Sequence, residues 1–391
     1  MTELINTLLL LGAGHGLFLA VILVTKRVNS TANRILAAAM VAFALYIFEG
    51  VYYSRGYYLA FPHLIGMSVP LVFLFGPIIY LYAAAVSSGA HGLRPRQWLH
   101  LTPAVAVFLY FLPYYLSSGE AKLAFMRELQ AHGPPLDLTI AGHLQFVVGV
   151  AYVILTVRLL KRHRAQIKEE FSSIERINLL WLRNLTVATA LIWALATGFY
   201  LVHLLGFGTQ MEWDPTPLAV SCLVYGVGYM GLRQPEILHA PTARYPTPPP
   251  LPGVSAVPVA EQETGYEKSG LSAEEAEAAM QGLRRKMTES QLYLRSGLTL
   301  QELAAETGMS PHNLSEVINT RGGTNFYDFV NSYRVEEAMR RLRDPKYKHL
   351  TILAIAADAG FNSKSVFNAF FKEHTGQTPS QYRAAKEASS V

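Results

Sequence analysis

Seven apolar stretches in the first 240 residues constrain this chain more than any other feature of its sequence. They cover approximately residues 4–24, 33–53, 63–86, 98–116, 138–160, 182–205 and 217–232. Most of them approach the roughly 20 residues that a helix needs to cross the hydrocarbon core of a bilayer. The fourth contains Pro103 and Pro113, which neighbouring helices can accommodate within a membrane. We therefore expect residues 1–240 to form a seven-helix transmembrane bundle.

The composition argues against several classes of protein. Only 16% of the 391 residues are charged, against roughly 25% in an average soluble domain, so an ordinary soluble enzyme is not expected. The single cysteine, Cys222, excludes a disulfide framework within the chain. The sequence has no His-Glu-x-x-His motif, no two histidines four residues apart and no glycine-rich phosphate loop. No catalytic site, metal site or cofactor is therefore predicted.

Positive charge is concentrated in alternate predicted loops. If the amino terminus lies outside, 13 Lys and Arg residues fall in the inner loops and flanks, and only Arg55, Lys122 and Arg127 fall in the outer ones. The positive-inside rule favours this orientation. Seven spans then place the chain after residue 240 in the cytoplasm. That region contains 17 basic and 17 acidic residues, so any binding to nucleic acid depends on local placement of charge.

Four ionisable residues are predicted near the outer ends of the spans. They are Glu49, His63, His143 and His203. Ionisable residues within spans often mark functional sites, so these four are candidates for binding a ligand or signal. The alternative is that they lie at the wet membrane interface and hydrogen-bond to water or lipid headgroups.

A proline-rich stretch separates the two halves of the chain. Residues 241–264 contain seven prolines and are expected to form a semi-extended linker. In residues 265–295, Ser272 and Glu275 have the spacing of a capping box at the start of an amphipathic helix. The apolar stripe of this helix comprises Ala276, Met280, Leu283 and Met287. Two alternatives follow: the stripe packs on the domain after it, or it pairs with a second copy of the chain and couples the membrane half to the rest by association.

The pattern of helix, tight turn and helix occurs twice near the carboxyl terminus. In the first unit, the helix LQELAAET ends at Gly308, and Ser310 caps a second helix, PHNLSEVINT. In the second unit, an apolar helix ends at Gly360, and Ser363 caps the helix KSVFNAFFKEH. Apolar residues recur at helical spacing over residues 325–343, which predicts one long helix between the units. Two helix-turn-helix units would then be held at a fixed separation.

The stretch AGFNSKSVFNAFFKEHTGQTPSQYR carries a specific signature. Its signature positions are Gly360, Phe361, Ser363, Phe367, Phe370, Gly376, Thr378, Pro379, Tyr382 and Arg383. With the paired units, residues 299–383 resemble the AraC/XylS family of transcription regulators. The stretches GYEKSGLS and VINTRGGTNFYDFVNSYRVEEA are similar to the subgroup in which the DNA-binding domain follows a multi-span membrane region. The resemblance implies an all-α chain in which a seven-helix transmembrane bundle precedes a cytoplasmic double helix-turn-helix domain at residues 296–391.

The resemblance also implies which residues contact DNA. The recognition helices would be residues 311–320 and 364–374, each entering the major groove. Asparagine suits base edges, particularly adenine, whereas lysine and arginine suit phosphates. The candidate DNA-binding residues are His312, Asn313, Ser315, Asn319, Arg321, Ser363, Lys364, Ser365, Asn368 and Lys372. The alternative for each is an outward polar side chain that is only solvated.

These observations predict a membrane-bound, sequence-specific DNA-binding transcription regulator. It would be a multi-pass protein of the bacterial inner membrane that couples an external or in-membrane signal to promoter binding. Its expected partners are double-stranded DNA, the lipid bilayer, RNA polymerase and an unidentified signal ligand, and a homodimer is left open. Two alternatives stay open: a membrane enzyme or transporter with a regulatory DNA-binding domain, and a membrane half that serves only as an anchor with protein partners.

Overall fold

The computed structural model describes residues 2–27, 29–88, 92–175, 177–204, 214–233 and 272–389, and its regular elements are helices. Within these residues the β structure is limited to an isolated antiparallel bridge between Phe171 and Thr299. The chain divides into two compact units. The N-terminal unit comprises Met1–Lys161 and Leu179–Thr247, and the C-terminal unit comprises Arg162–Asn178 and Pro248–Val391. The expectation of an all-α chain is confirmed for the residues described.

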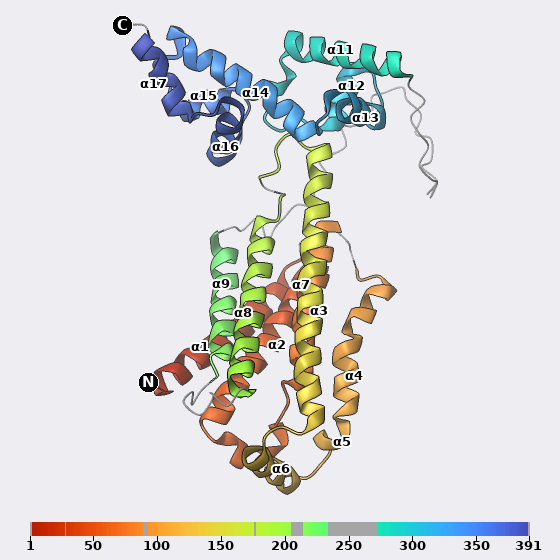
Figure 1. Ribbon diagram of the computed structural model, residues 1–391, viewed down its shortest axis with the longest axis vertical. Coiled ribbons are helices and arrows are strands. Elements are labelled where there is room, and N and C mark those ends of the chain that lie inside the picture. Colours follow the sequence, from red (N-terminus) through yellow and green to blue (C-terminus); the bar gives the residue numbers. More distant parts are fainter. Residues whose placement is uncertain are drawn as a thin grey trace. The chain divides into compact units, whose positions relative to one another are not determined.

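The N-terminal unit is built from long apolar helices (Figure 1). Among the described residues, five helices are long and apolar enough to cross a membrane. They are α1 (Thr2–Thr25), α2 (Ser30–Ser54), α3 (Val69–Ser88), α7 (Leu136–Glu170) and α8 (Leu180–Leu204). The shorter elements are η1 (Tyr57–Leu59), η2 (Pro62–Leu64), η3 (Pro95–Leu101), α4 (Thr102–Tyr110), α5 (Leu112–Tyr115), α6 (Gly119–His132) and α9 (Thr216–Arg233).

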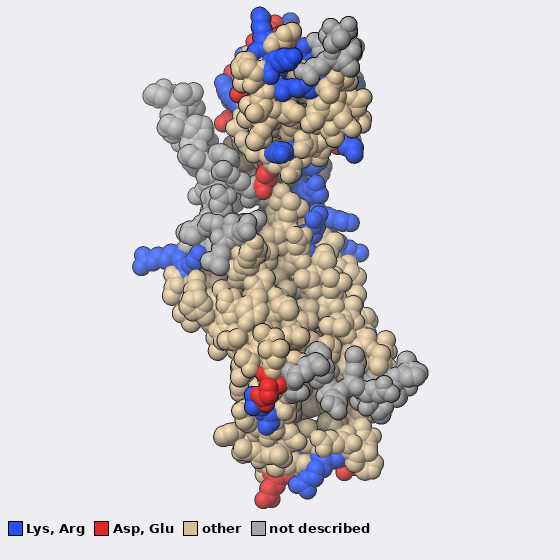
Figure 2. Space-filling model, turned by 90° about the vertical axis from the view of Figure 1, so that its left-hand side faces the viewer, with Lys and Arg blue, Asp and Glu red and all other residues tan. Residues whose placement is uncertain are grey.

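The long helices are apolar on both their inner and outer faces. α1, α2, α3 and α9 pack around a core that includes Met40, Phe43 and Ile47 of α2. Large apolar side chains such as Phe18 and Leu191 are nevertheless more than half exposed. Figure 2 shows a broad surface of this unit with few charged residues. A helix that is hydrophobic all round requires burial in protein or in a membrane, so this surface is typical of contact with lipid.

The fourth predicted span, residues 98–116, is not a continuous helix. It is divided among η3, α4 and α5, and Pro103 and Pro113 each lie in the first turn of a new helix. Proline is favoured in the first turn because backbone N–H groups there have no hydrogen-bond acceptor within the helix, so the absence of an N–H costs nothing. Further inside a helix, proline removes a hydrogen bond. α4 has 9 residues, about 14 Å of helix, which is less than half of a hydrocarbon core. The apolar part of α9 is also short, so five candidate spans are found and the count of seven stays a prediction.

The C-terminal unit contains both predicted helix-turn-helix units (Figure 1). The first is formed by α12 (Leu300–Thr307) and α13 (Pro311–Gly322), the second by α15 (Ile352–Asp358) and α16 (Lys364–Thr375), and α14 (Phe326–Arg343) joins them. The flanking elements are α11 (Ala273–Ser290), η5 (Leu292–Leu294), η6 (Pro345–Tyr347) and α17 (Pro379–Ser389). The capping box predicted at Ser272 is formed, and Thr299 and Glu302 form a second capping box at the start of α12.

The apolar stripe of α11 is buried within the C-terminal unit. Its residues Ala276, Met280, Leu283 and Met287 are 8%, 2%, 1% and 0% exposed. They belong to one core with apolar residues of α12, α13 and α14. The stripe therefore packs on the domain that follows it. The alternative, in which it pairs with a second copy of the chain, is wrong because its side chains are already covered.

α14 connects two small cores. Phe326 and Val330 near its start join the core around α12 and α13. Val335 and Ala338, further along, join the core around α15 and α16. One helix thus packs against both helix-turn-helix units, which fixes their separation as the apolar spacing over residues 325–343 predicts.

Candidate nucleic-acid interface

The first helix-turn-helix unit depends on local caps at its turn. Gly308 adopts a φ of +69°, which ends α12 with a left-handed residue. The Ser310 hydroxyl accepts a hydrogen bond from the backbone N–H of Asn313 at 3.1 Å, so α13 begins directly after the turn. The buried face of α13 consists of Leu314, Val317 and Ile318. The opposite face of α13 is therefore turned outward.

The second unit has the same pattern of a glycine at the turn followed by a serine cap, and its glycine lies close to the backbone of Tyr293. Gly360 has a φ of +96°, and a Cβ at this position would lie 2.6 Å from the carbonyl oxygen of Tyr293. Only glycine fits such a conformation and such a contact. The Ser363 hydroxyl accepts a hydrogen bond from the Val366 amide at 3.4 Å and begins α16. Burial of Phe367 on the inner face leaves the polar face of α16 exposed.

The structure places the predicted DNA-binding residues on or beside the outward faces of α13 and α16. The exposed ones are His312, Asn319, Arg321, Lys364, Ser365, Asn368 and Lys372, and the half-buried ones are Asn313, Ser315 and Ser363. Arg321 is partly engaged within the protein, since it donates to the carbonyl oxygen of Ala273 at 3.0 Å. Ser363 acts as the cap of α16. Exposure is compatible with contact to DNA, and the role of each residue in binding stays a prediction.

Sequence reasoning missed the segment that lies beside these helices. Residues 162–178, the end of α7 and the chain that follows it, belong to the C-terminal unit, and we call them the docking segment. The Ser172 amide donates to the carbonyl oxygen of Leu298 at 3.1 Å, next to the bridge between Phe171 and Thr299. The only signal in the sequence was the basic character of this predicted loop, which orientation in a membrane explains equally well.

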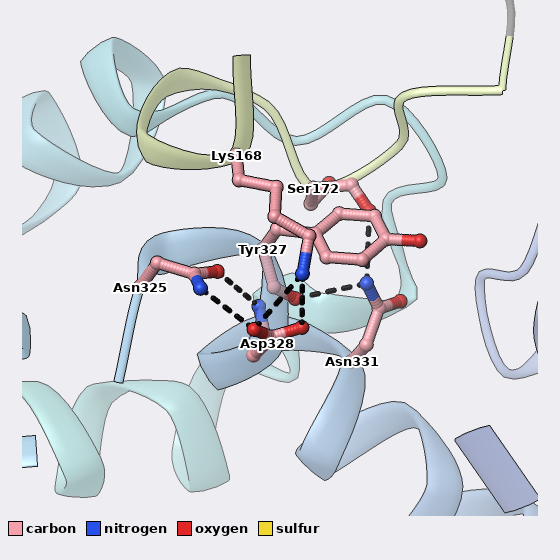
Figure 3. Close-up of polar contacts among 6 residues, drawn as sticks. All are labelled: Lys168, Ser172, Asn325, Tyr327, Asp328 and Asn331. Carbon is pink, nitrogen blue, oxygen red and sulfur yellow. Dashed lines mark hydrogen bonds and ion pairs between the residues drawn. The ribbon is translucent and has the colours of Figure 1, made fainter. Parts of the chain in front are cut away.

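Polar side chains of α14 hold the docking segment (Figure 3). The Lys168 ammonium lies 3.1 and 3.2 Å from the two carboxylate oxygens of Asp328. The same ammonium lies 5.0 Å from the centre of the Tyr327 ring, a cation–π distance. Asn331 donates to the Ser172 carbonyl oxygen at 3.2 Å. Two successive turns of α14 thus contact Lys168 and Ser172 of the segment.

Arg334 joins the docking segment to the core of the C-terminal unit. Its side chain is 0% exposed. The guanidinium donates to the carbonyl oxygens of Tyr293, Arg295 and Ser172 at 2.8, 2.8 and 2.9 Å, and to the Ser172 hydroxyl at 3.0 Å. Burial lowers the pKa of Arg334 to about 10, so the group is still charged at neutral pH. An arginine within an amphipathic helix carries no local sign of such burial.

The predicted sensor residues lie in the N-terminal unit. Glu49 is 6% exposed and accepts a backbone hydrogen bond at 3.5 Å. The carbonyl oxygen of His63 accepts a hydrogen bond from the buried Lys122 ammonium at 3.0 Å. His143 is exposed, with its ring nitrogen 2.7 Å from a backbone carbonyl oxygen, and the side chain of His203 lies outside the described residues. The role of these four residues in sensing stays a prediction.

Comparison with known proteins identifies similar chains for the C-terminal region. The pattern of the helix-turn-helix domain family matches residues 303–385. An uncharacterized HTH-type transcriptional regulator of Staphylococcus aureus is 37% identical over 98 residues, which cover 25% of this chain and 13% of that protein. The probable transcription factor PqrA of Proteus vulgaris is 31% identical over 98 residues, which cover 25% of this chain and 78% of that protein.

These similarities differ in how much of each relative they cover. The chain matches only 13% of the length of the Staphylococcus aureus protein. A solved structure of a protein of unknown function from Listeria innocua is 27% identical, with 27% of this chain and 95% of that chain covered, but its TM-score of 0.24 supports no conclusion about fold. PqrA, in contrast, is matched over most of its length. With its two helix-turn-helix units, this chain belongs to the AraC/XylS family of transcription regulators.

Proposed function

We propose that this transcription regulator is membrane-bound, binds specific DNA sequences and couples an external or in-membrane signal to promoter binding. The observation that carries the proposal is the joining of two helix-turn-helix units to a unit with five long apolar helices. Such helices expose large apolar side chains, which are stable in lipid but costly in water. The signal is then received by the N-terminal unit and read out by the C-terminal unit.

In the proposed complex, α13 and α16 enter successive segments of the major groove. The exposed amides of Asn319 and Asn368 are suited to base edges, because asparagine forms paired hydrogen bonds with adenine. The exposed ammonium groups of Lys364 and Lys372 are suited to phosphates, which position the protein without reading sequence. α14 sets the distance between the two helices and hence the spacing of the two half-sites.

Substitutions on α16 should separate base reading from phosphate binding. Asn368→Ala is expected to relax discrimination at one base pair by about 1–3 kcal/mol, because a paired hydrogen bond to one base is lost. Lys372→Ala is expected to weaken binding to all sequences alike and to lower the salt slope by about 1, because one phosphate contact is lost. Affinities of the full chain in lipid nanodiscs for single-base variants of its site, at several salt concentrations, measure both effects.

The control for this pair is Lys346→Ala, which removes a lysine of η6 outside both recognition helices. This substitution should leave the discrimination between single-base variants of the DNA site unchanged. An Asn368→Ala variant that lost equal affinity for every site variant would contradict the base-reading role of Asn368.

The orientation in the membrane should be visible in reporter fusions. Fusions after Ser88 and Lys168 are expected to report a cytoplasmic location, and a fusion after Gly119 an external one. Two arguments support this: the basic residues cluster in the same predicted loops, and the docking segment lies in one unit with the helix-turn-helix units, so both are on the same side of the membrane. A cytoplasmic signal at Gly119 would mean that the broken stretch of η3, α4 and α5 does not cross, and the seven-span topology would be wrong.

A further inference from the structure

The docking segment contacts both recognition helices and the helix between them. Glu169 contacts α13, Lys168 and Ser172 contact α14, and apolar residues of the segment contact α16. A segment that contacts all three helices lies on the surface between α13 and α16. This is the surface that the proposed function assigns to DNA.

The contact with α13 involves two predicted DNA-binding residues. The Glu169 carboxylate accepts hydrogen bonds from the Asn319 amide at 3.1 Å and from the Ser315 hydroxyl at 3.4 Å. Asn319 also donates to the Ser315 hydroxyl at 3.4 Å. Ser315 and Asn319 are one turn apart and therefore share a face of α13. The Glu169 carboxylate thus occupies the hydrogen-bond donors of Asn319 and Ser315, which base edges or phosphates would need. Its negative charge would also repel the phosphates of a bound DNA.

Apolar packing anchors the segment against α14 and α16. Ile167 and Ile174 are buried in a small cluster with Tyr327 of α14, and Val366 and Phe370 of α16 pack against that cluster. The cluster is supported by the ion pair between Lys168 and Asp328 and by the hydrogen bond from Asn331 to Ser172, both shown in Figure 3. Such burial stabilises a docked conformation, whereas a loop with only charged residues would stay in water.

We propose that the docking segment is an intramolecular competitor of DNA. This inference rests on the proposed function, which assigns Ser315 and Asn319 to DNA. In the docked state, Glu169 and the segment occupy the face of α13, and the major groove has room for one helix but not for a helix with a second chain against it. DNA binding therefore requires the segment to leave, and by linkage a bound DNA favours the released state.

The position of the segment in the chain gives the signal a route to DNA binding. The segment begins within the last turns of α7 and leads into α8, so it is continuous with two candidate spans. The proline-rich linker predicted at residues 241–264 lies outside the residues that the structure describes. A change in the spacing or rotation of α7 and α8 acts directly on the segment and shifts the balance between docked and released states.

The sharpest test is a substitution that affects DNA affinity in two opposite ways: its charge weakens binding, whereas release of the docking segment strengthens binding. Ile174→Asp adds a negative charge, which by itself weakens binding to DNA, but it breaks the apolar anchor of the segment. We expect the full chain with Ile174→Asp, in nanodiscs, to bind DNA more tightly than the wild type. If about 90% of the chain is docked, release lowers the apparent Kd roughly tenfold. The probe is a duplex selected from a random pool by the wild-type chain, with a shuffled duplex of equal composition.

A second pair of variants isolates the contact with α13. Glu169→Gln is expected to lower the apparent Kd by about fivefold, since it removes a charged acceptor shared by two donors. Glu170→Gln is the matched control: it makes the same charge change one residue away, at an exposed position with no hydrogen bond or ion pair among the described residues. It should change the apparent Kd by less than about twofold.

Hydrogen exchange gives a readout of docking that does not depend on affinity. The Ser172 amide is protected only while it donates to Leu298, so its exchange should speed up in Ile174→Asp and when the selected duplex is added to the wild type. Amides of α12 and α13 should stay protected in both cases, which shows that the domain is folded. Unchanged Ser172 exchange with bound DNA, or weaker DNA binding by Ile174→Asp, would overturn the proposal. A wild-type chain that does not distinguish selected from shuffled duplex would instead contradict the proposed function.

Discussion

Replacing Met280 and Leu283 by glutamate is expected to unfold the C-terminal unit. Both side chains are almost completely buried in the core that α11 shares with α12, α13 and α14. Each substitution loses about 2 kcal/mol of apolar burial. Each new carboxylate must also be buried, either charged in an apolar core or protonated at a further cost. A combined loss of roughly 5 kcal/mol or more approaches the whole stability of a domain of this size.

Hydrogen exchange of the α12 and α13 amides in the full chain measures this loss. The chain contains a second, independent probe, since its four tryptophans, Trp98, Trp181, Trp193 and Trp213, all precede the linker. Tryptophan fluorescence therefore reports on the N-terminal part and should not change. The matched control is Gln281→Glu with Thr288→Glu, which adds the same charge at exposed positions of α11 and should cost less than about 1 kcal/mol. Full protection with loss of self-association alone would show that the stripe is a dimer contact after all.

Arg334→Met is expected to cost about 3–5 kcal/mol of the stability of the C-terminal unit. The substitution retains the apolar stem of the side chain but removes every hydrogen bond of the guanidinium. The carbonyl oxygens of Tyr293, Arg295 and Ser172 then lose a charged donor in a buried place. Exchange of the α14 amides, which reports the free energy of opening, measures the loss.

Two further substitutions show whether geometry or charge is responsible. Arg334→Lys retains the charge but replaces a planar fork of donors with a single ammonium, so an intermediate loss is expected. Arg340→Met makes the same replacement of arginine by methionine at a largely exposed position of α14. Arg340 pairs with Glu337, and its replacement should lower the stability of the C-terminal unit by no more than about 1 kcal/mol. Equal losses in Arg334→Met and Arg340→Met would mean that the buried hydrogen bonds of Arg334 contribute little.

The helices of the C-terminal unit were predictable because their signals are local. A capping box requires only residues three apart, and the pairs at Ser272 and Thr299 form as the sequence indicates. The turns require glycine at a left-handed position, and Gly308 and Gly360 supply it. The fourth apolar stretch shows the limit of such reasoning. Its average hydropathy suits a span, but Pro103 begins a new helix and shortens it below the thickness of a bilayer.

Periodicity shows that a helix face is covered but not what covers it. The stripe of α11 had the same spacing whether it packed within its own domain or against a second copy. The core of the C-terminal unit resolves this, because Leu283 and Met287 are buried there with residues of α12 and α13. Exposure of α16 was predictable for the converse reason, since the buried Phe367 and Phe371 leave Asn368 and Lys372 on the other side.

The sequence by itself determined the helical class, the two helix-turn-helix units with their family, and the apolar character of the N-terminal unit, because contiguous residues encode each of them. Only the tertiary structure decided where residues 162–178 lie. Their contacts join residues far apart in the chain: Lys168 meets Asp328, and Ser172 meets Arg334. A lysine in a basic loop has the same local pattern whether it faces water, a lipid headgroup or a carboxylate. The folded chain selects its partner through geometry, and no motif or period in the sequence encodes that choice.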